Sequence, residues 1–290
     1  MWWRGVRDAC QAGLVVRALR QDAAIRTLMW KAVRLNVLCF AGLNVVVSFI
    51  MFPLFETWIA AGSETEMQRL FVQFLYYFMT IVFNVFFLFP IYVSTVISNS
   101  DYYFEIAQRV EKMLPTELKP VTTAPPPRWQ DRGADTVYER LIVLSFLIIT
   151  APLYFVPYIG TFLYFSYCCW CYGYYCFGYT WLLRRTDWNL ENRLNYFELH
   201  WVYFLGFGTP FTVLLWYFPL VVGLGIYAVL FPIFVAMAQA STPKRAHSTN
   251  RLLPHRISIF YEAKLLANLL LHLLHKCFPS SPAPPNPSAS

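Results

Sequence analysis

Four long stretches of this chain contain no Lys, Arg, Asp or Glu. They span residues 35–55, 70–100, 141–183 and 201–243. A bilayer with a hydrocarbon core about 30 Å thick requires roughly 20 consecutive apolar residues in a helix, because every backbone polar group must be bonded within the segment. Over the whole chain, 58% of the residues are hydrophobic and 13% are charged. This leaves too few polar residues to cover the surface of a soluble globular protein. We therefore expect an all-α polytopic membrane protein.

The lengths of the uncharged stretches predict how many helices each contains. The first two predict one long transmembrane helix each, over 35–58 and 70–100. The third and fourth are about twice the length of one crossing. They predict helical hairpins over 141–183 and 201–243, with helix-breaking Pro and Gly residues near their centres. Because the hairpin tips carry no charge, two alternatives stay open: these helices cross the membrane fully, or they penetrate it partly as re-entrant segments.

The distribution of basic residues predicts the orientation in the membrane, because cytoplasmic loops retain Lys and Arg. With both termini in the cytoplasm, 22 of the 23 basic residues lie on the cytoplasmic side. The cytoplasmic segments are then 1–34, 101–140, 184–200 and 244–290, and the exception is Arg69. The net charge of +7 thus indicates a basic face beside anionic lipid headgroups. It does not indicate nucleic-acid binding.

The segments outside the spans complete a single membrane domain over residues 1–275. Residues 1–34 place apolar side chains opposite several arginines, which is typical of an interfacial helix. The expected anchors of this helix are Trp2, Trp3, Arg4 and Arg7. Residues 257–277 predict a second amphipathic helix. The Pro-rich centre of 101–140 predicts an extended cytoplasmic loop, and residues 278–290, rich in Pro and Ser, predict a disordered tail.

No catalytic motif is present, so we expect a protein that is not an enzyme and that binds no cofactor. Four cysteines lie close together in the third uncharged stretch, at positions 168, 169, 171 and 176. These small, soft side chains lie among aromatic residues and have no second group of ligands nearby, which favours packing over a metal site. The expected partners are the bilayer and its anionic headgroups.

One part of the fourth stretch could hold an anion without any buried charge. Gly206 and Gly208 permit a break in the helix, while Thr209 suits the cap and Pro210 the first position of a new helix. A helix that starts there would aim free N–H groups at an anion. The alternative is that the glycines permit close packing of helices.

A second possible contribution to an anion path is the basic pair Arg184 and Arg185, directly after the third stretch. A basic pair at that place could meet an anion at a pore mouth. The alternative is that the pair only fixes the topology.

Several segments resemble the etoposide-induced protein 2.4 family in residues, order and spacing. They are residues 176–181 (CFGYTW), 190–194 (LENRL), 201–210 (WVYFLGFGTP) and 238–243 (AQASTP). That family is similar, more distantly, to the bacterial CysZ sulfate permeases, which have two long transmembrane helices and two pairs of partly penetrating helices. The first resemblance implies an endoplasmic reticulum membrane protein in autophagy and in growth or apoptosis control. The second implies passage of sulfate.

Two functional hypotheses follow from these resemblances. The first is a non-enzymatic scaffold that engages lipid or unidentified membrane and autophagy proteins. The second is a channel or permease for sulfate or another anion, with its path at Gly206 to Pro210. A polar passage at the glycines would favour the channel. A closed aromatic plug of Phe207, Phe211 and Trp216 would favour the scaffold.

The topology is testable by cysteine-accessibility labelling. Single cysteines at position 64 should react only from the lumenal side, and those at positions 130 and 190 only from the cytoplasmic side, because basic loops stay in the cytoplasm. Labelling of position 64 from the cytosol would contradict the topology.

Overall fold

The computed structural model describes residues 1–46, 49, 53, 57, 66–83, 89–114, 133–150, 152–153, 156–185, 188–218, 220–243 and 256–277. Over these residues the chain forms helices and no strands, which confirms the all-α prediction. In chain order the helices are α1 (Trp2–Ala9), α2 (Ala12–Gln21), α3 (Ala23–Val46), α5 (Glu66–Phe83), α6 (Phe89–Met113), α7 (Gly133–Thr150), α8 (Ile159–Arg184), α9 (Leu190–Leu199), α10 (Trp201–Tyr217), α11 (Leu220–Ala240) and α12 (Tyr261–Cys277).

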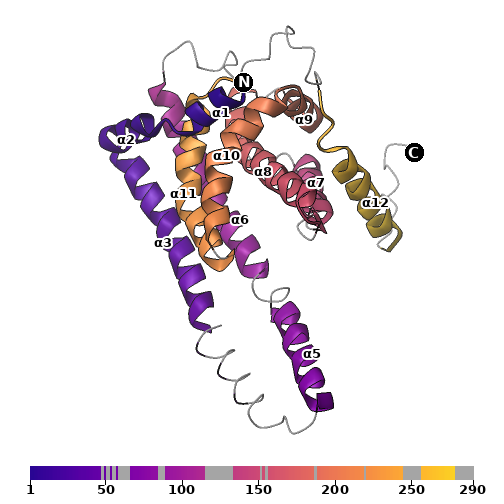
Figure 1. Cartoon of the computed structure of the whole chain (residues 1–290). Helices are drawn as coiled ribbons and strands as arrows, with labels where there is room; N and C mark the ends of the chain where they lie inside the picture. Colours follow the sequence, from indigo (N-terminus) through magenta and orange to yellow (C-terminus); the bar gives the residue numbers. More distant parts are fainter. Residues whose placement is uncertain are drawn as a thin grey trace, which may run out of the picture.

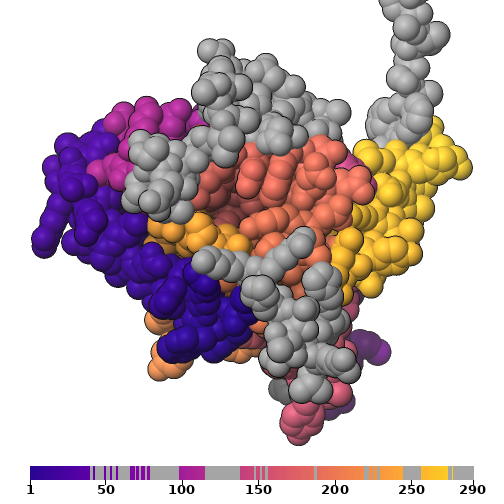
Figure 2. Space-filling model, turned by 90° about the horizontal axis from the view of Figure 1, so that it is seen from above, coloured from indigo at the N-terminus to yellow at the C-terminus, as the bar shows by residue number. Residues whose placement is uncertain are grey.

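Helices α8, α10 and α11 form the centre of the bundle; α1, α3 and α6 pack against them, α12 packs on α7, and α5 lies apart from the bundle (Figure 1). Helix α10 contacts α1 and α8, whereas α11 contacts α3, α6 and α8. In the view from above, the indigo N-terminal helices lie on one side of the molecule and yellow α12 on the opposite side (Figure 2). The lower ends of α10 and α11 lie short of the lower end of α3 in Figure 1.

Among the described helices, none is both long enough and apolar enough to cross a membrane alone. Helices α9 and α10 taken together are long and apolar enough, but they meet at a bend of 86°.

Several expected segments fall partly or wholly outside the described residues. These are the end of the first span after Val46, residues 84–88 of the second, the Pro-rich centre of the cytoplasmic loop and the 278–290 tail. Residues 1–34 contain α1, α2 and the first half of α3 where one interfacial helix was expected. The number of crossings and the topology stay predictions.

The core of the bundle is aromatic. Phe177, Phe204 and Phe207 are almost fully buried, and the ring of Phe177 meets the other two edge to face, with centroids 5.0 and 4.9 Å away. The ring of Phe197 on α9 stacks on that of Phe204 on α10, with centroids 4.2 Å apart, although α9 and α10 meet at a sharp bend. Each such pair contributes about 0.5–1.5 kcal/mol beyond the area that it buries. These contacts hold α8, α9 and α10 together.

The reversal between α7 and α8 depends on one strained residue and one glycine. Tyr158 has a positive φ of 58°, which is uncommon for a residue with a side chain. At Gly160, a Cβ atom would overlap the Leu153 carbonyl and the Val156 side chain. The tight return of the chain therefore requires glycine at position 160.

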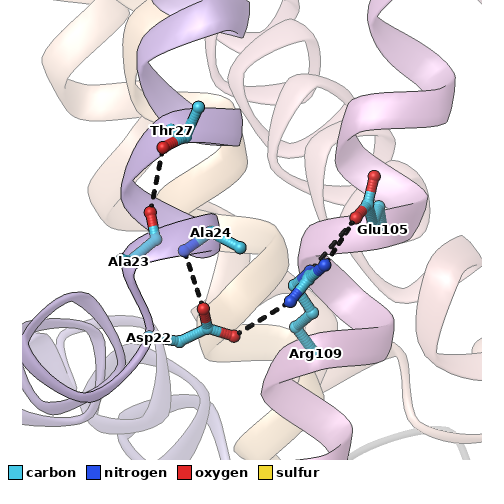
Figure 3. Close-up of polar contacts among 6 residues, drawn as sticks. All are labelled: Asp22, Ala23, Ala24, Thr27, Glu105 and Arg109. Atoms are coloured by element: carbon cyan, nitrogen blue, oxygen red, sulfur yellow. Dashed lines mark hydrogen bonds and ion pairs between the residues drawn. The ribbon is translucent and has the colours of Figure 1, made fainter.

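Asp22 joins the beginning of α3 to α6 (Figure 3). Its carboxylate accepts a hydrogen bond from the Ala24 N–H at 2.7 Å, as a helix-capping residue does. Its other oxygen lies 3.3 Å from Nη1 of Arg109, whose guanidinium also pairs with Glu105 at 2.9 Å. The hydrogen bond from Ala24 and then the interaction with Arg109 lower the pKa of the Asp22 carboxyl below its ordinary value of 3.8.

Substitutions of Asp22 should distinguish the stability that comes from the helix cap from the stability that comes from the ion pair. Asp22→Asn keeps an oxygen for the cap, so its melting temperature near pH 7 should lie between those of the wild type and Asp22→Ala. Because folding lowers the pKa, the charge stabilises the fold above pH 3.8 and loses this effect as the pH falls through the lowered pKa. The gap between wild type and Asp22→Asn should therefore narrow near pH 3, as measured in detergent. An unchanged gap would mean that the ion pair does not contribute.

Candidate functional site

The N-terminal helix α1 lies against α10 with the two backbones in direct contact. A Cβ atom at Gly206 would overlap the Trp2 carbonyl oxygen, and one at Gly5 would overlap the Tyr203 carbonyl oxygen. On the other side of α10, a Cβ at Gly208 would overlap the Cys169 carbonyl oxygen of α8. Small residues permit such close approach between helices. The glycines of α10 thus allow two other helices to touch its backbone.

Polar side chains add to the contact between α1 and α10. The Asp8 carboxylate is buried and accepts hydrogen bonds from the Tyr203 hydroxyl at 2.9 Å and from the Gln11 amide at 3.1 Å. The Trp2 indole N–H donates to the Thr209 hydroxyl at 3.2 Å. A buried carboxylate is tolerated only when it is hydrogen-bonded, so Asp8 fixes the position of α1. We call Trp2, Gly5, Asp8, Tyr203, Gly206 and Thr209 the N-terminal clasp.

The predicted helix break at Gly206 to Pro210 is wrong. Helix α10 is continuous from Trp201 to Tyr217, with Pro210 inside it. The Thr209 hydroxyl donates to the Leu205 carbonyl at 2.7 Å and does not cap a helix start. The bend lies at His200, between α9 and α10. The cause is tertiary packing, because α1 and α8 lie directly against the glycines that would otherwise permit the break.

Aromatic side chains fill the region next to these glycines. Phe207 and Phe211 are each only 1% exposed, and the Phe211 ring lies 4.4 Å from that of Phe234 on α11. Trp216 is more exposed and lies farther along α10, with its ring 5.7 Å from those of Tyr164 and Phe165. Phe207 and Phe211 are therefore packed in the interior, whereas Trp216 is exposed.

Arg184 is part of a buried network that joins α6, α8 and α11. Its Nε and Nη2 atoms donate to Glu111 at 2.9 and 2.8 Å, and Nη2 also donates to the Gln239 carbonyl. The two charged side chains are only 13% and 9% exposed. With its amide oriented to satisfy both of its polar atoms, Gln239 donates to Glu111 at 3.1 Å and accepts from Thr180 at 3.2 Å. We call Glu111, Thr180, Arg184 and Gln239 the polar junction.

The predicted basic pair does not act as one group. Glu111 already balances the charge of Arg184, whereas Arg185 lies over the Trp188 ring at 5.2 Å. Arg184 also lies 15 residues beyond Cys169 along α8, or roughly 22 Å at the helical rise. Since Cys169 marks the level of Gly208, the arginines and the glycines do not meet in a single site.

The expected interfacial anchors divide between protein and surface. Helix α1 buries Gly5, Asp8 and Ala9, a different face from the apolar side that the sequence suggested. Trp3 and Arg7 are exposed, Trp2 is partly engaged by Thr209, and Arg4 is half-buried. Contact of this exposed apolar edge with lipid stays a prediction.

The sequence reasoning missed several residues that make buried polar contacts, among them Asp8, Glu111 and Gln239. Gln239 had a signal, because it is the only Asn or Gln in the uncharged stretch 201–243, and the structure buries it fully. Asp8 and Glu111 had none, because each lies among other charged residues along the chain. In the described part of the chain, no group of three or more His, Cys, Asp or Glu is placed to hold a metal ion.

The family model described as Sulfate transporter CysZ/Etoposide-induced protein 2.4 matches residues 11–232. The chain belongs to this family. It is 28% identical over 275 residues to "Protein EI24 homolog" of Dictyostelium discoideum, and the aligned region covers 94% of this chain and 84% of that protein. It is 27% identical over 306 residues to "Protein EI24 homolog" of Arabidopsis thaliana, with 94% of each chain covered. No solved structure matches the chain. The match extends through α9, α10 and most of α11 and so includes Gly206, Phe207, Gly208 and Phe211, whereas α1 lies outside it.

Alanine substitutions test the packing role of the glycines. Gly206→Ala and Gly208→Ala each insert a methyl group between touching backbones, and overpacking of this kind costs about 1–3 kcal/mol. The melting temperature of the purified protein should fall in both variants.

Gly178 provides a matched control on α8. A Cβ there meets nothing within 4 Å, and Ala is favoured over Gly in a helix by about 1 kcal/mol. Gly178→Ala should therefore keep or raise the melting temperature. Equal effects of all three substitutions would contradict the packing explanation.

Proposed function

We propose that this EI24-type protein is a multi-pass protein of the endoplasmic reticulum membrane, with both termini in the cytoplasm. In that membrane it acts as a non-enzymatic scaffold in autophagy and in growth or apoptosis control. Membership of the CysZ/EI24 family supports the membrane location. The finer role rests on the resemblance to the etoposide-induced protein 2.4 family, and the geometry of α10 is compatible with it.

The observation that carries the scaffold proposal is the closed packing around α10. Backbones of α1 and α8 lie against Gly206 and Gly208, and Phe207 and Phe211 fill the adjacent space. A route for a hydrated anion needs polar groups that replace the hydration shell. The polar side chains beside these glycines, on Asp8, Tyr203 and Thr209, are bonded within the protein instead.

Passage of sulfate is the second candidate, because the family description includes a sulfate transporter. In the arrangement described here, Arg184 is paired with Glu111 and α1 lies over Gly206. Conduction near α10 would therefore require α1 to move away. The two candidates differ in one direct measurement, the flux of sulfate through the purified protein.

Sulfate uptake into liposomes provides the test. Liposomes that contain the purified protein should take up radiolabelled sulfate no faster than protein-free liposomes. A saturable uptake that rises with the amount of protein would overturn the scaffold proposal in favour of a permease.

The cellular arm of the test uses cells that lack the protein. Autophagic degradation should be reduced in these cells, and expression of the full chain in the endoplasmic reticulum should restore it. Normal degradation in their absence would contradict the role in autophagy. The Gly178→Ala variant should restore degradation as well as the wild type does, because a Cβ at position 178 meets nothing within 4 Å. This variant shows that a glycine-to-alanine change by itself does not impair the function.

A further inference from the structure

Helix α12 has its small side chains fully buried against the protein and several of its leucines exposed, while Leu266 and Leu270 are half-buried. The helix packs on α7, and its buried side chains among the described residues are Ala263 and Ala267, at 2% and 0% exposure. Leu265, Leu269 and Leu273 are 64%, 54% and 48% exposed. In water the hydrophobic effect favours the opposite arrangement, with leucines inside. Small residues at the contact and large apolar residues outside are typical of helices that pack within lipid.

The rotation of α12 about its axis is fixed by specific contacts at its beginning. Phe260 is buried, with its ring 5.3 Å from Tyr174 and 5.5 Å from Phe197. Its backbone N–H donates to Glu198 at 3.3 Å, and Glu198 also pairs with Arg256 at 2.6 Å. These contacts determine which face of the following helix meets α7.

A hydrogen bond fixes the same rotation farther along α12. The Tyr138 hydroxyl of α7 donates to the Asn268 side chain at 2.8 Å. Because Asn268 follows buried Ala267 directly, the leucines at 265, 269 and 273 must point away from α7. The exposed leucines are therefore a consequence of the native packing.

The spacing of the exposed leucines distinguishes between possible occupants of this face. A second copy that packs as a coiled coil would need apolar residues at alternating intervals of three and four. After Leu265 and Leu269, that pattern falls on His272 and Lys276. The apolar side chains instead follow intervals of four, from Tyr261 to Leu273. Glu262, His272 and Lys276 lie among them on the same exposed side, and such an amphipathic face suits the headgroup boundary of a bilayer better than a narrow helical seam.

Two further features of the surface agree with lipid. Ile148 and Leu144 on α7 are exposed apolar side chains on the helix next to α12, so the leucine face continues an apolar exterior. Lys264 and Lys276 lie on the same helix, where they can reach anionic headgroups while their neighbours contact acyl chains.

We propose that α12 is a lipid-embedded helix, with Leu265, Leu269 and Leu273 in contact with the acyl chains of a bilayer that contains anionic phospholipid. Helix α7 and the Glu198–Arg256 pair hold it in this orientation. The C-terminal helix is thus both a packing partner of the bundle and an attachment to the membrane.

Site-specific photo-crosslinking tests this proposal. The full-length protein, with p-benzoylphenylalanine at position 269, is reconstituted into vesicles of phosphatidylcholine and phosphatidylserine and irradiated. Mass spectrometry should find phospholipid adducts several-fold more often than with the same probe at position 268. The probe at 268 should instead link to α7, because Asn268 contacts Tyr138. Unchanged melting temperatures would show that both labelled proteins are folded.

The other outcomes contradict the proposal in distinguishable ways. A crosslinked dimer from position 269 would assign this face to a second copy of the chain. A link from 269 to another segment of the same chain would mean that the protein itself covers the leucines. Neither lipid nor protein adducts at 269 would place the face in water. Each result is independent of whether the protein conducts sulfate or acts in autophagy.

Discussion

Helix α10 is the part of the structure that other helices depend on, because it touches two of them backbone to backbone. Gly206 faces α1 and Gly208 faces α8. Within lipid the hydrophobic effect does not drive helices together, so close packing and hydrogen bonds must do so. Both are present at α10, where glycine contacts are reinforced by the bonds from Tyr203 to Asp8 and from Trp2 to Thr209. The same contacts that build the bundle also close the region where an anion path was expected.

The charged side chains that the described residues bury share a position relative to the predicted membrane. They are Asp8, Glu111, Arg193 and Glu198, and each belongs to a segment that the basic-residue distribution places in the cytoplasm. Arg193 pairs with Glu139 at 3.1 Å, and the other three also have polar partners. A buried ion pair adds little net stability but fixes geometry strictly, because a charge that loses its partner is costly. These pairs therefore set how the helix ends meet, while apolar packing fills the rest.

The sequence predicted the class of fold because absence of charge over a long stretch is a local property with one physical explanation. It could not predict which helices touch. Asp8 and Tyr203 are 195 residues apart, and Glu111 and Arg184 are 73 apart, so neither pair leaves a trace in local periodicity. At Pro210 the local preference for a helix start was overruled by contacts from α1 and α8. Gly206 and Gly208 showed the same ambiguity, because glycine permits both a break and a close contact.

The N-terminal clasp has a consequence for how the chain is made. Helix α1 binds a helix that is synthesised about 200 residues after it, since Trp2 and Thr209 are 207 residues apart. At roughly 5–20 residues per second, α1 waits on the order of 10–40 s for its partner to be synthesised. During that interval the buried face of α1, with its Asp8 carboxylate, has no native protein contact to α10. The N-terminal clasp can therefore form only after α10 has been synthesised, so this part of the bundle closes late in the synthesis of the chain.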